Sequence, residues 1–173
     1  MLITIAATLG GCRKSAPKQA ADGTQIVPLQ ASAEEGSPMF DMQIPDINRN
    51  NVSLMSLIQK NKITIVDFWA SWCGPCMQEM PNMVALYNQY KDKGLGIVGI
   101  SLDTDHNAWK EAIRQQGMEW PQLSELRQWE DNAAATAANV KAIPLTIVVD
   151  QSGKILKRNL RGEELAAFIK PLL

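Results

Sequence analysis

The feature that most constrains this chain is the segment Trp72-Cys73-Gly74-Pro75-Cys76. It follows an apolar run, Ile63–Trp69, and opens a stretch in which apolar residues recur at helical spacing. A thiol at a helix N-terminus meets unpaired N–H groups and the positive end of the helix dipole, which favour its thiolate form. Pro75 suits a first helical turn because it has no N–H to lose there. A CxxC pair between a strand and a helix therefore predicts a redox-active dithiol/disulfide.

Two other roles for the cysteines fit this sequence less well. A structural zinc site uses four Cys or His ligands, whereas the chain has only three cysteines and one histidine, His106. A purely structural disulfide across two residues would close too short a loop to gain much from chain entropy. We therefore expect redox exchange, with no metal ion and no cofactor.

The length and charge of the chain limit its class. A chain of 173 residues is about one domain. Its net charge of −1 leaves no basic patch of the kind that binds nucleic acid.

The first twelve residues are short and apolar and end in small residues. This stretch is too short to span a bilayer and is typical of a signal-peptide core. Leu9-Gly10-Gly11-Cys12 resembles the lipobox of bacterial lipoproteins, in which the cysteine becomes the lipidated first residue. No Lys or Arg precedes the apolar stretch, so a buried segment with an incidental cysteine stays open as the alternative. We interpret residues 1–12 as a lipoprotein signal segment ending at the lipidation site Cys12.

The next segment changes in composition. Residues 13–37 are rich in Ala, Lys, Gln, Ser, Gly, Pro and Glu and show little apolar periodicity. Such a composition is typical of a flexible tether. The sequence thus predicts a tether over residues 13–37 and one domain over residues 38–173.

The 38–173 domain is expected to alternate strands and helices. The expected strands are a short one within Met39–Ile47, then Ile63–Trp69, Leu95–Ser101, Leu145–Val149 and Lys154–Leu160, and the expected helices are Leu54–Ile58, the CxxC to Tyr90, Ala108–Gln116, Leu126–Ala138 and Glu163–Ile169. Asn48–Asn51 is expected to be a turn, and Pro81 is expected to kink the long helix. This order predicts an α/β fold with one central mixed sheet, helices on both faces and an N-terminal strand extension.

Two motifs together resemble a known family. They are the segment from Val66 to Cys76 and, far downstream, Val140-Lys141-Ala142-Ile143-Pro144. The chain resembles the thioredoxin-like superfamily, specifically its envelope-tethered TlpA/ResA-like branch, over residues 38–173. The resemblance implies that Cys73 is the attacking thiol, Cys76 the resolving thiol and Pro144 a cis-proline against the cysteines. It also implies that Trp72, Gly74, Pro75, Ile143 and Pro144 form the substrate-binding surface.

Two acids are candidates for proton transfer. Asp67 lies on a strand expected to be buried, where an acid is costly unless it has a purpose. It matches the buried acid beneath the site in the family, and a surface or capping role is the alternative. Glu79, three residues after Cys76, matches an acid that this branch often has there, and an acid in a first helical turn also simply stabilises the helix dipole.

The resemblance and the CxxC chemistry imply a thiol–disulfide oxidoreductase, acting as a reductant in the bacterial cell envelope. It would face the periplasm from a lipid anchor, take electrons from an upstream membrane donor and act on protein disulfides or thiols, with cytochrome c maturation as one setting. Two alternatives remain open. A peroxiredoxin-like peroxidase shares the extended N-terminal strands, but it typically has Thr and Pro shortly before its cysteine, and a copper-delivery protein usually has a CxxxC spacing and a distal His.

Overall fold

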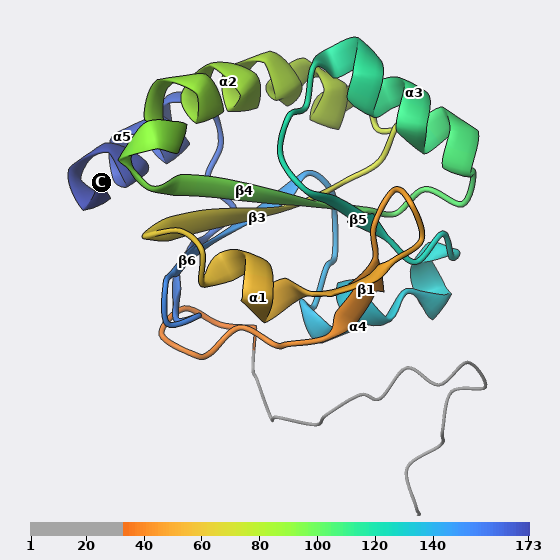
Figure 1. The fold of residues 1–173 in the computed structure, drawn as a ribbon, viewed down its shortest axis with the longest axis horizontal. Coiled ribbons are helices and arrows are strands. Elements are labelled where there is room, and N and C mark those ends of the chain that lie inside the picture. Colours follow the sequence, from red (N-terminus) through yellow and green to blue (C-terminus); the bar gives the residue numbers. More distant parts are fainter. Residues whose placement is uncertain (1–32) are drawn as a thin grey trace, which may run out of the picture.

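A five-stranded mixed sheet forms the centre of the protein (Figure 1). The computed structural model describes residues 33–173, so Cys12 and residues 13–32 lie outside the described residues. In spatial order the strands are β5 (Gln122–Ser124), β4 (Leu95–Ser101), β3 (Ile63–Trp69), β6 (Leu145–Asp150) and β7 (Ile155–Arg158). Strands β3, β4 and β5 run parallel, whereas β6 is antiparallel to β3 and to β7. Every residue of β3 and β4 is buried, which explains why both form almost continuous apolar runs.

Helices cover both faces of this sheet, as the sequence predicted. On one face lie α2 (Gly74–Tyr90), α3 (His106–Gln116) and α5 (Gly162–Ile169) (Figure 1). On the other face lie the shorter α1 (Leu54–Ile58) and α4 (Ala133–Ala137) (Figure 1). Short 3₁₀ turns follow at Lys91–Lys93, Trp129–Asp131 and Lys170–Leu172. The predicted α/β fold, with one central mixed sheet and helices on both faces, is confirmed.

Local sequence signals explain where several helices begin and end. The Ser53 hydroxyl accepts the Ser56 N–H at the start of α1, and the Asp105 carboxylate accepts the Ala108 N–H at the start of α3. Gly117 ends α3 in the left-handed conformation at φ 67°, which costs glycine little. Pro81 lies inside α2, which continues through it to Tyr90.

The N-terminal extension touches both edges of the central sheet. Strands β1 (Gln43–Pro45) and β2 (Asn51–Ser53) form a small antiparallel hairpin, and Asp46 beside it bridges to Leu123 of β5. Earlier in the chain, Pro38 bridges to Lys154 at the other edge. The expected strand within 39–47 is thus only three residues long.

The start of the domain differs from the predicted boundary at residue 38. Ala33 is buried, the Gly36 N–H donates to the Ile155 carbonyl, and the Ile155 N–H donates to the Ser37 carbonyl. Residues 33–37 therefore belong to the domain and not to a tether. Hydrogen bonds between their backbone and that of Ile155 at the edge of β7 hold these residues in place. Because backbone groups make these contacts, the side chains show no apolar periodicity from which the sequence could predict them.

The predicted helix over Leu126–Ala138 is wrong for its first half. Leu126 has a positive φ of 52°, and a 3₁₀ turn precedes a helix that starts only at Ala133. The Asn132 side chain caps that helix through the Ala135 N–H, and the Glu125 carboxylate accepts the N–H groups of Ala133 and Ala134. Because two side chains satisfy the first N–H groups of α4, the helix begins there. Strands β2 and β5 were also missed, since three residues are too few to show a period.

Candidate active site

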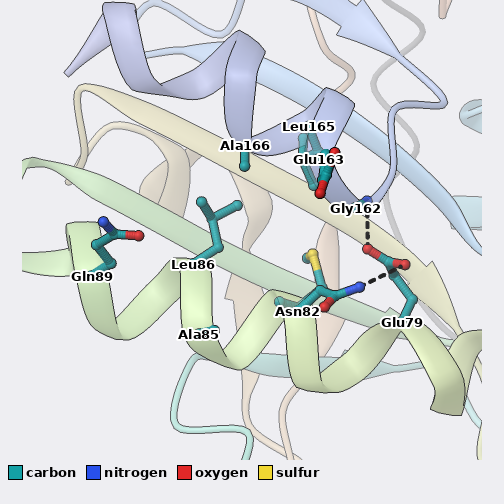
Figure 2. A pocket seen from close by; sticks show the side chains of 10 residues that line it. Glu79, Asn82, Ala85, Leu86, Gln89, Gly162, Glu163, Leu165 and Ala166 are labelled. Atoms are coloured by element: carbon teal, nitrogen blue, oxygen red, sulfur yellow. Dashed lines mark hydrogen bonds between the residues drawn. The ribbon is translucent and has the colours of Figure 1, made fainter.

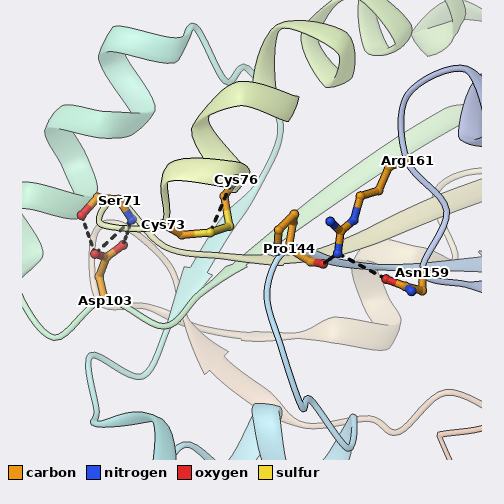
Figure 3. Close-up of a disulfide and its surroundings, with 7 residues drawn as sticks. All are labelled: Ser71, Cys73, Cys76, Asp103, Pro144, Asn159 and Arg161. Atoms are coloured by element: carbon orange, nitrogen blue, oxygen red, sulfur yellow. Dashed lines mark hydrogen bonds between the residues drawn. A yellow bond between two sulfur atoms is a disulfide. The ribbon is translucent and has the colours of Figure 1, made fainter.

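Cys73 and Cys76 form a disulfide at the junction of β3 and α2 (Figure 3). Cys73 is the N-cap residue of α2, and its sulfur accepts the Cys76 N–H at 3.2 Å. Cys76 is fully buried, whereas Cys73 retains 5% exposure. In the reduced pair the helix N-terminus and this N–H favour a thiolate on Cys73. The geometry thus makes Cys73 the sulfur that meets a partner and Cys76 the one behind it.

The surface around the disulfide is formed by the residues that the sequence proposed for substrate binding. Trp72 is 61% exposed, an unusual state for a tryptophan in this protein, and Gly74 and Pro75 are exposed as well. An exposed aromatic ring beside a reactive sulfur provides apolar contact area for another molecule.

Pro144 lies among the surroundings of the disulfide (Figure 3). Leu145 pairs with Phe68 across β6 and β3, so the residue before β6 comes to the end of β3 from which the CxxC departs. The Ile143–Pro144 peptide bond is cis, as the resemblance implied. Pro144 is buried and Ile143 half-buried.

Asp67 is a buried acid in the middle of the sheet. It is only 3% exposed and faces Gly99 on β4 and Thr146 on β6 in the strand register. The pKa of the Asp67 carboxyl is raised from 3.8 to about 7: burial raises it most, the negative charge of Glu79 adds to the rise, and the positive charge of Arg161 opposes both. The structure therefore gives Asp67 the burial that the sequence predicted, and the surface alternative is wrong.

Glu79 connects two helices. Its Oε1 accepts the Gly162 N–H at 2.7 Å, and its Oε2 accepts the Asn82 side-chain amide at 3.4 Å (Figure 2). Gly162 is the first residue of α5. Glu79 therefore caps the N-terminus of a helix distant in sequence, a role that its position in α2 alone does not reveal. A cavity of about 420 Å³ lies beside it between α2 and α5, lined by side chains that include Met83, Leu86 and Leu165.

Asp103 is a site residue that the sequence analysis missed. This buried carboxylate accepts the backbone N–H of Ser71 at 3.0 Å and the Ser71 hydroxyl at 2.6 Å (Figure 3). It also accepts the Ser101 hydroxyl at 2.7 Å. Ser71 is two residues before Cys73, so Asp103 fixes the approach to the CxxC. The available signal was its place just after β4, at the carboxyl ends of the parallel strands.

Trp69, the last residue of β3, is held by a hydrogen bond from its indole ring to a buried glutamine. Its indole N–H donates to Gln122 Oε1 at 3.0 Å, and the Gln122 amide reaches the Met118 sulfur at 3.2 Å. Gly99 makes room for this glutamine, because a Cβ there would lie 2.1 Å from Gln122 Oε1. A buried polar network thus supports the strand that delivers the cysteines.

The single histidine, His106, is not part of a group of metal-ligating side chains in the described residues. His106 opens α3, with its Nε2 3.0 Å from the Ile47 carbonyl oxygen and its ring edge-on to Trp109. Within residues 33–173, no three His, Cys, Asp or Glu side chains are grouped so that they could hold a metal ion.

Comparison with known proteins places this geometry in a family. The AhpC/TSA family model matches residues 36–158. A thiol-disulfide oxidoreductase ResA from Bacillus thuringiensis (strain Al Hakam) is 28% identical over 132 residues, which cover 75% of this chain and 73% of the relative. The ResA protein of Bacillus subtilis (strain 168) is 28% identical over 126 residues, covering 73% of this chain and 67% of the relative.

Solved structures agree with the sequence relatives. The thioredoxin domain of a thiol-disulfide oxidoreductase from Bacteroides vulgatus superposes with a TM-score of 0.72 at 33% identity, covering 80% of this chain and 96% of that one. A thiol-disulfide oxidoreductase from Bacteroides fragilis NCTC 9343 gives a TM-score of 0.73 at 29% identity, with 79% and 100% coverage. Because the family model spans most of the chain and the CxxC, cis-proline and buried acid occur together on this fold, the chain belongs to the AhpC/TSA family and is a thiol–disulfide oxidoreductase.

Proposed function

We propose that the protein reduces disulfides of other proteins in the bacterial cell envelope, with Asp67 as the proton acceptor of the reaction. The observation that carries this proposal is the placement of the Cys73–Cys76 pair at the N-terminus of α2, just after β3, the strand that contains Asp67. A carboxyl whose pKa is about 7 can both take and return a proton near neutral pH.

The reaction starts from the reduced pair. The Cys73 thiolate attacks one sulfur of the partner disulfide, so that a bond forms between Cys73 and the partner while the other partner sulfur leaves as a thiolate. Trp72 and the Ile143–Pro144 segment surround Cys73 and would contact the partner in this mixed disulfide.

The second step releases the partner. Cys76 transfers its proton to the Asp67 carboxylate, directly or through a water molecule, and its thiolate attacks the Cys73 sulfur. The Cys73–Cys76 disulfide forms, the bond to the partner breaks, and the partner leaves with its second thiolate. Two electrons have passed from the dithiol to the partner. An upstream membrane electron donor would then restore the dithiol.

The two cysteines can be tested separately. Cys73→Ser should abolish insulin reduction, whereas Cys76→Ser should trap mixed disulfides on Cys73 because the resolving thiol is gone. Partners trapped in cells would identify the client, with apocytochrome c as one candidate. Turnover of the Cys76→Ser variant at the parent rate would contradict the two-cysteine mechanism.

The direction of electron flow needs its own measurement. Gly-Pro between the cysteines favours the reducing end of the range of potentials found on this fold, which extends from thioredoxin near −270 mV to DsbA near −120 mV. Equilibration against glutathione and dithiothreitol measures the potential of this pair. A value at the DsbA end would identify an oxidant and contradict the proposed direction.

The envelope location rests on Cys12, which lies outside the described residues. A lipidated Cys12 would anchor the domain with more than one acyl chain, enough for stable attachment. Within residues 33–173, no helix has the length and apolarity to cross a membrane. Cys12→Ala should move the protein from the membrane to the soluble envelope fraction while leaving exchange unchanged, and recovery of an unmodified parent chain from the cytoplasm would contradict the location.

The family match keeps peroxide reduction as a second candidate. A peroxide-consumption assay run beside the insulin assay separates the two, because a peroxidase consumes hydrogen peroxide without a protein disulfide. A copper titration of the reduced protein tests the delivery alternative. We expect insulin reduction with neither peroxide turnover nor tight copper binding.

A further inference from the structure

Arg161 contacts the active site through the cis-proline. It lies in the loop between β7 and α5, and its Nη2 donates to the Pro144 carbonyl oxygen at 2.7 Å (Figure 3). The same nitrogen is 3.4 Å from Asn159 Oδ1, so a neighbouring side chain also orients it. The guanidinium of an exposed residue thereby joins two segments that are seventeen residues apart in the chain.

The loop that carries Arg161 is held on both sides. On the sheet side, the Asn159 N–H donates to the Thr146 carbonyl at 2.8 Å and the Thr146 hydroxyl donates to the Leu160 carbonyl at 2.6 Å. On the helix side, the next residue, Gly162, donates its N–H to Glu79 at 2.7 Å. The backbone that carries Arg161 is therefore fixed on both sides of this residue.

This arrangement also brings a positive charge to the buried acid. Thr146, which anchors the loop, is the cross-strand neighbour of Asp67. Two charged groups act on Asp67: Glu79 from α2 raises its pKa and Arg161 lowers it. The two active-site cysteines at the start of α2 form a disulfide here and become titratable thiols only in the reduced protein. No other residue in the described chain both binds the cis-proline and acts on the acid.

We propose that Arg161 is a positioning residue of the exchange reaction. It holds the cis-Pro144 segment by its carbonyl oxygen and places a positive charge on the loop anchored to Thr146, the cross-strand neighbour of Asp67. The inference rests on the proposed role of Asp67 as proton acceptor. Its effect is to keep Asp67 ionised at a lower pH, so that the proton acceptor is available across the neutral range.

The test removes the charge while keeping the length of the side chain. Arg161→Met should raise the midpoint of the pH–rate profile for insulin reduction by roughly 0.5–1 pH unit, since a nearby cation no longer favours the carboxylate. The ¹³C chemical shift of the Asp67 carboxyl, followed against pH in the oxidised protein, reports the pKa of this group directly. The midpoint of that titration should rise by the same amount. Arg161→Lys, which restores the charge, should return both midpoints most of the way.

Arg158 provides a matched control. Its Nη2 also donates to a backbone carbonyl, that of Ala138, at 2.8 Å, but it does not act on Asp67. Arg158→Met should therefore leave the Asp67 titration at its parent value. In an Asp67→Asn background, Arg161→Met should no longer shift the rate profile.

Several outcomes would overturn the inference. An Asp67 carboxyl titration that is the same in the parent and in Arg161→Met contradicts the role of the charge, whatever happens to the rate. A shift that persists in the Asp67→Asn background shows that Arg161 acts elsewhere. If Asp67→Asn alone leaves the parent rate profile unchanged while Arg161→Met moves the carboxyl titration, the proton-acceptor role of Asp67 fails and the electrostatic contact stands.

Discussion

Asp103 accepts hydrogen bonds from both the backbone N–H and the hydroxyl of Ser71, and so fixes the turn from which the active-site cysteines depart. The helix N-terminus lies on one side of the CxxC, and the buried carboxylate of Asp103, just after β4, holds the turn on the other side. The position of Cys73 thus depends on a residue thirty positions downstream in the chain.

Replacement of Asp103 by Asn should weaken both the fold and the chemistry. An amide has one acceptor oxygen where the carboxylate has two, so a buried donor of Ser71 or Ser101 loses its partner at a cost of about 1–3 kcal/mol. Urea unfolding should report this loss, and exchange with DTNB should slow because the turn moves. Asp105→Asn is the matched control, since this exposed N-cap of α3 tolerates Asn equally well. Equal stability and rate in Asp103→Asn and the parent would mean that other contacts hold the turn.

The contribution of Asp67 to stability should fall as pH rises. Its pKa is 3.8 in the unfolded chain and about 7 in the folded protein, so between these values the folded state binds more protons and loses stability with increasing pH. This contribution is fully present below pH 4 and is lost above pH 7, a change of about 4 kcal/mol.

Asp67→Asn isolates that contribution. Urea unfolding of the oxidised protein between pH 4 and 8 should give equal free energies of unfolding for parent and variant at pH 4. At pH 8 the variant should be the more stable one, because the parent then holds an ionised buried carboxyl. A difference between the two proteins that does not change with pH would show that Asp67 does not titrate in this range.

Glu79 combines a capping role and an electrostatic role that two substitutions separate. Glu79→Gln keeps an acceptor for the Gly162 N–H but removes the negative charge that raises the pKa of Asp67, so the pH–rate midpoint should move to lower pH with little loss of stability. Glu79→Ala removes both and should cost about 1 kcal/mol more, the usual value of a lost helix cap. Glu163→Gln, an exposed acid in the first turn of α5, is the control and should leave the midpoint unchanged.

A side chain at Gly99 should disrupt the support beneath Trp69. The added Cβ of Gly99→Ala would lie 2.1 Å from Gln122 Oε1, so the glutamine must move and the Trp69 indole loses its acceptor. We expect a loss of about 1–3 kcal/mol in unfolding free energy, as for other overpacked buried sites, with a changed tryptophan fluorescence. For stability alone, Gly74→Ala is the control, because nothing lies within 4 Å of a Cβ there. An unchanged emission spectrum in Gly99→Ala would contradict this account.

The sequence predicted the parts of the site that lie close together along the chain. Two fully buried strands, Ile63–Trp69 and Leu95–Ser101, matched their apolar runs, and the CxxC matched the start of α2. The cis-proline was reached through a family motif. The contacts of Asp103 and Arg161 could not be found this way, because they join segments that only the folded sheet brings together. For Asp103 the one sequence signal was its place just after β4. The same limit explains Glu79, whose partner Gly162 is eighty-three residues away.

The N-terminal extension has a consequence for how copies of this protein meet. One continuous segment pairs with β7 through Pro38 and its neighbours and with β5 through Asp46, so it occupies backbone groups at both rims of the sheet. An unpaired edge strand is a template on which a second chain can add a strand, which is the first step toward aggregation. Residues 36–46 thus cover part of both edges, where a second copy of the chain could otherwise add a strand. Deleting residues up to 46 would leave a catalytic pair on a domain inclined to polymerise.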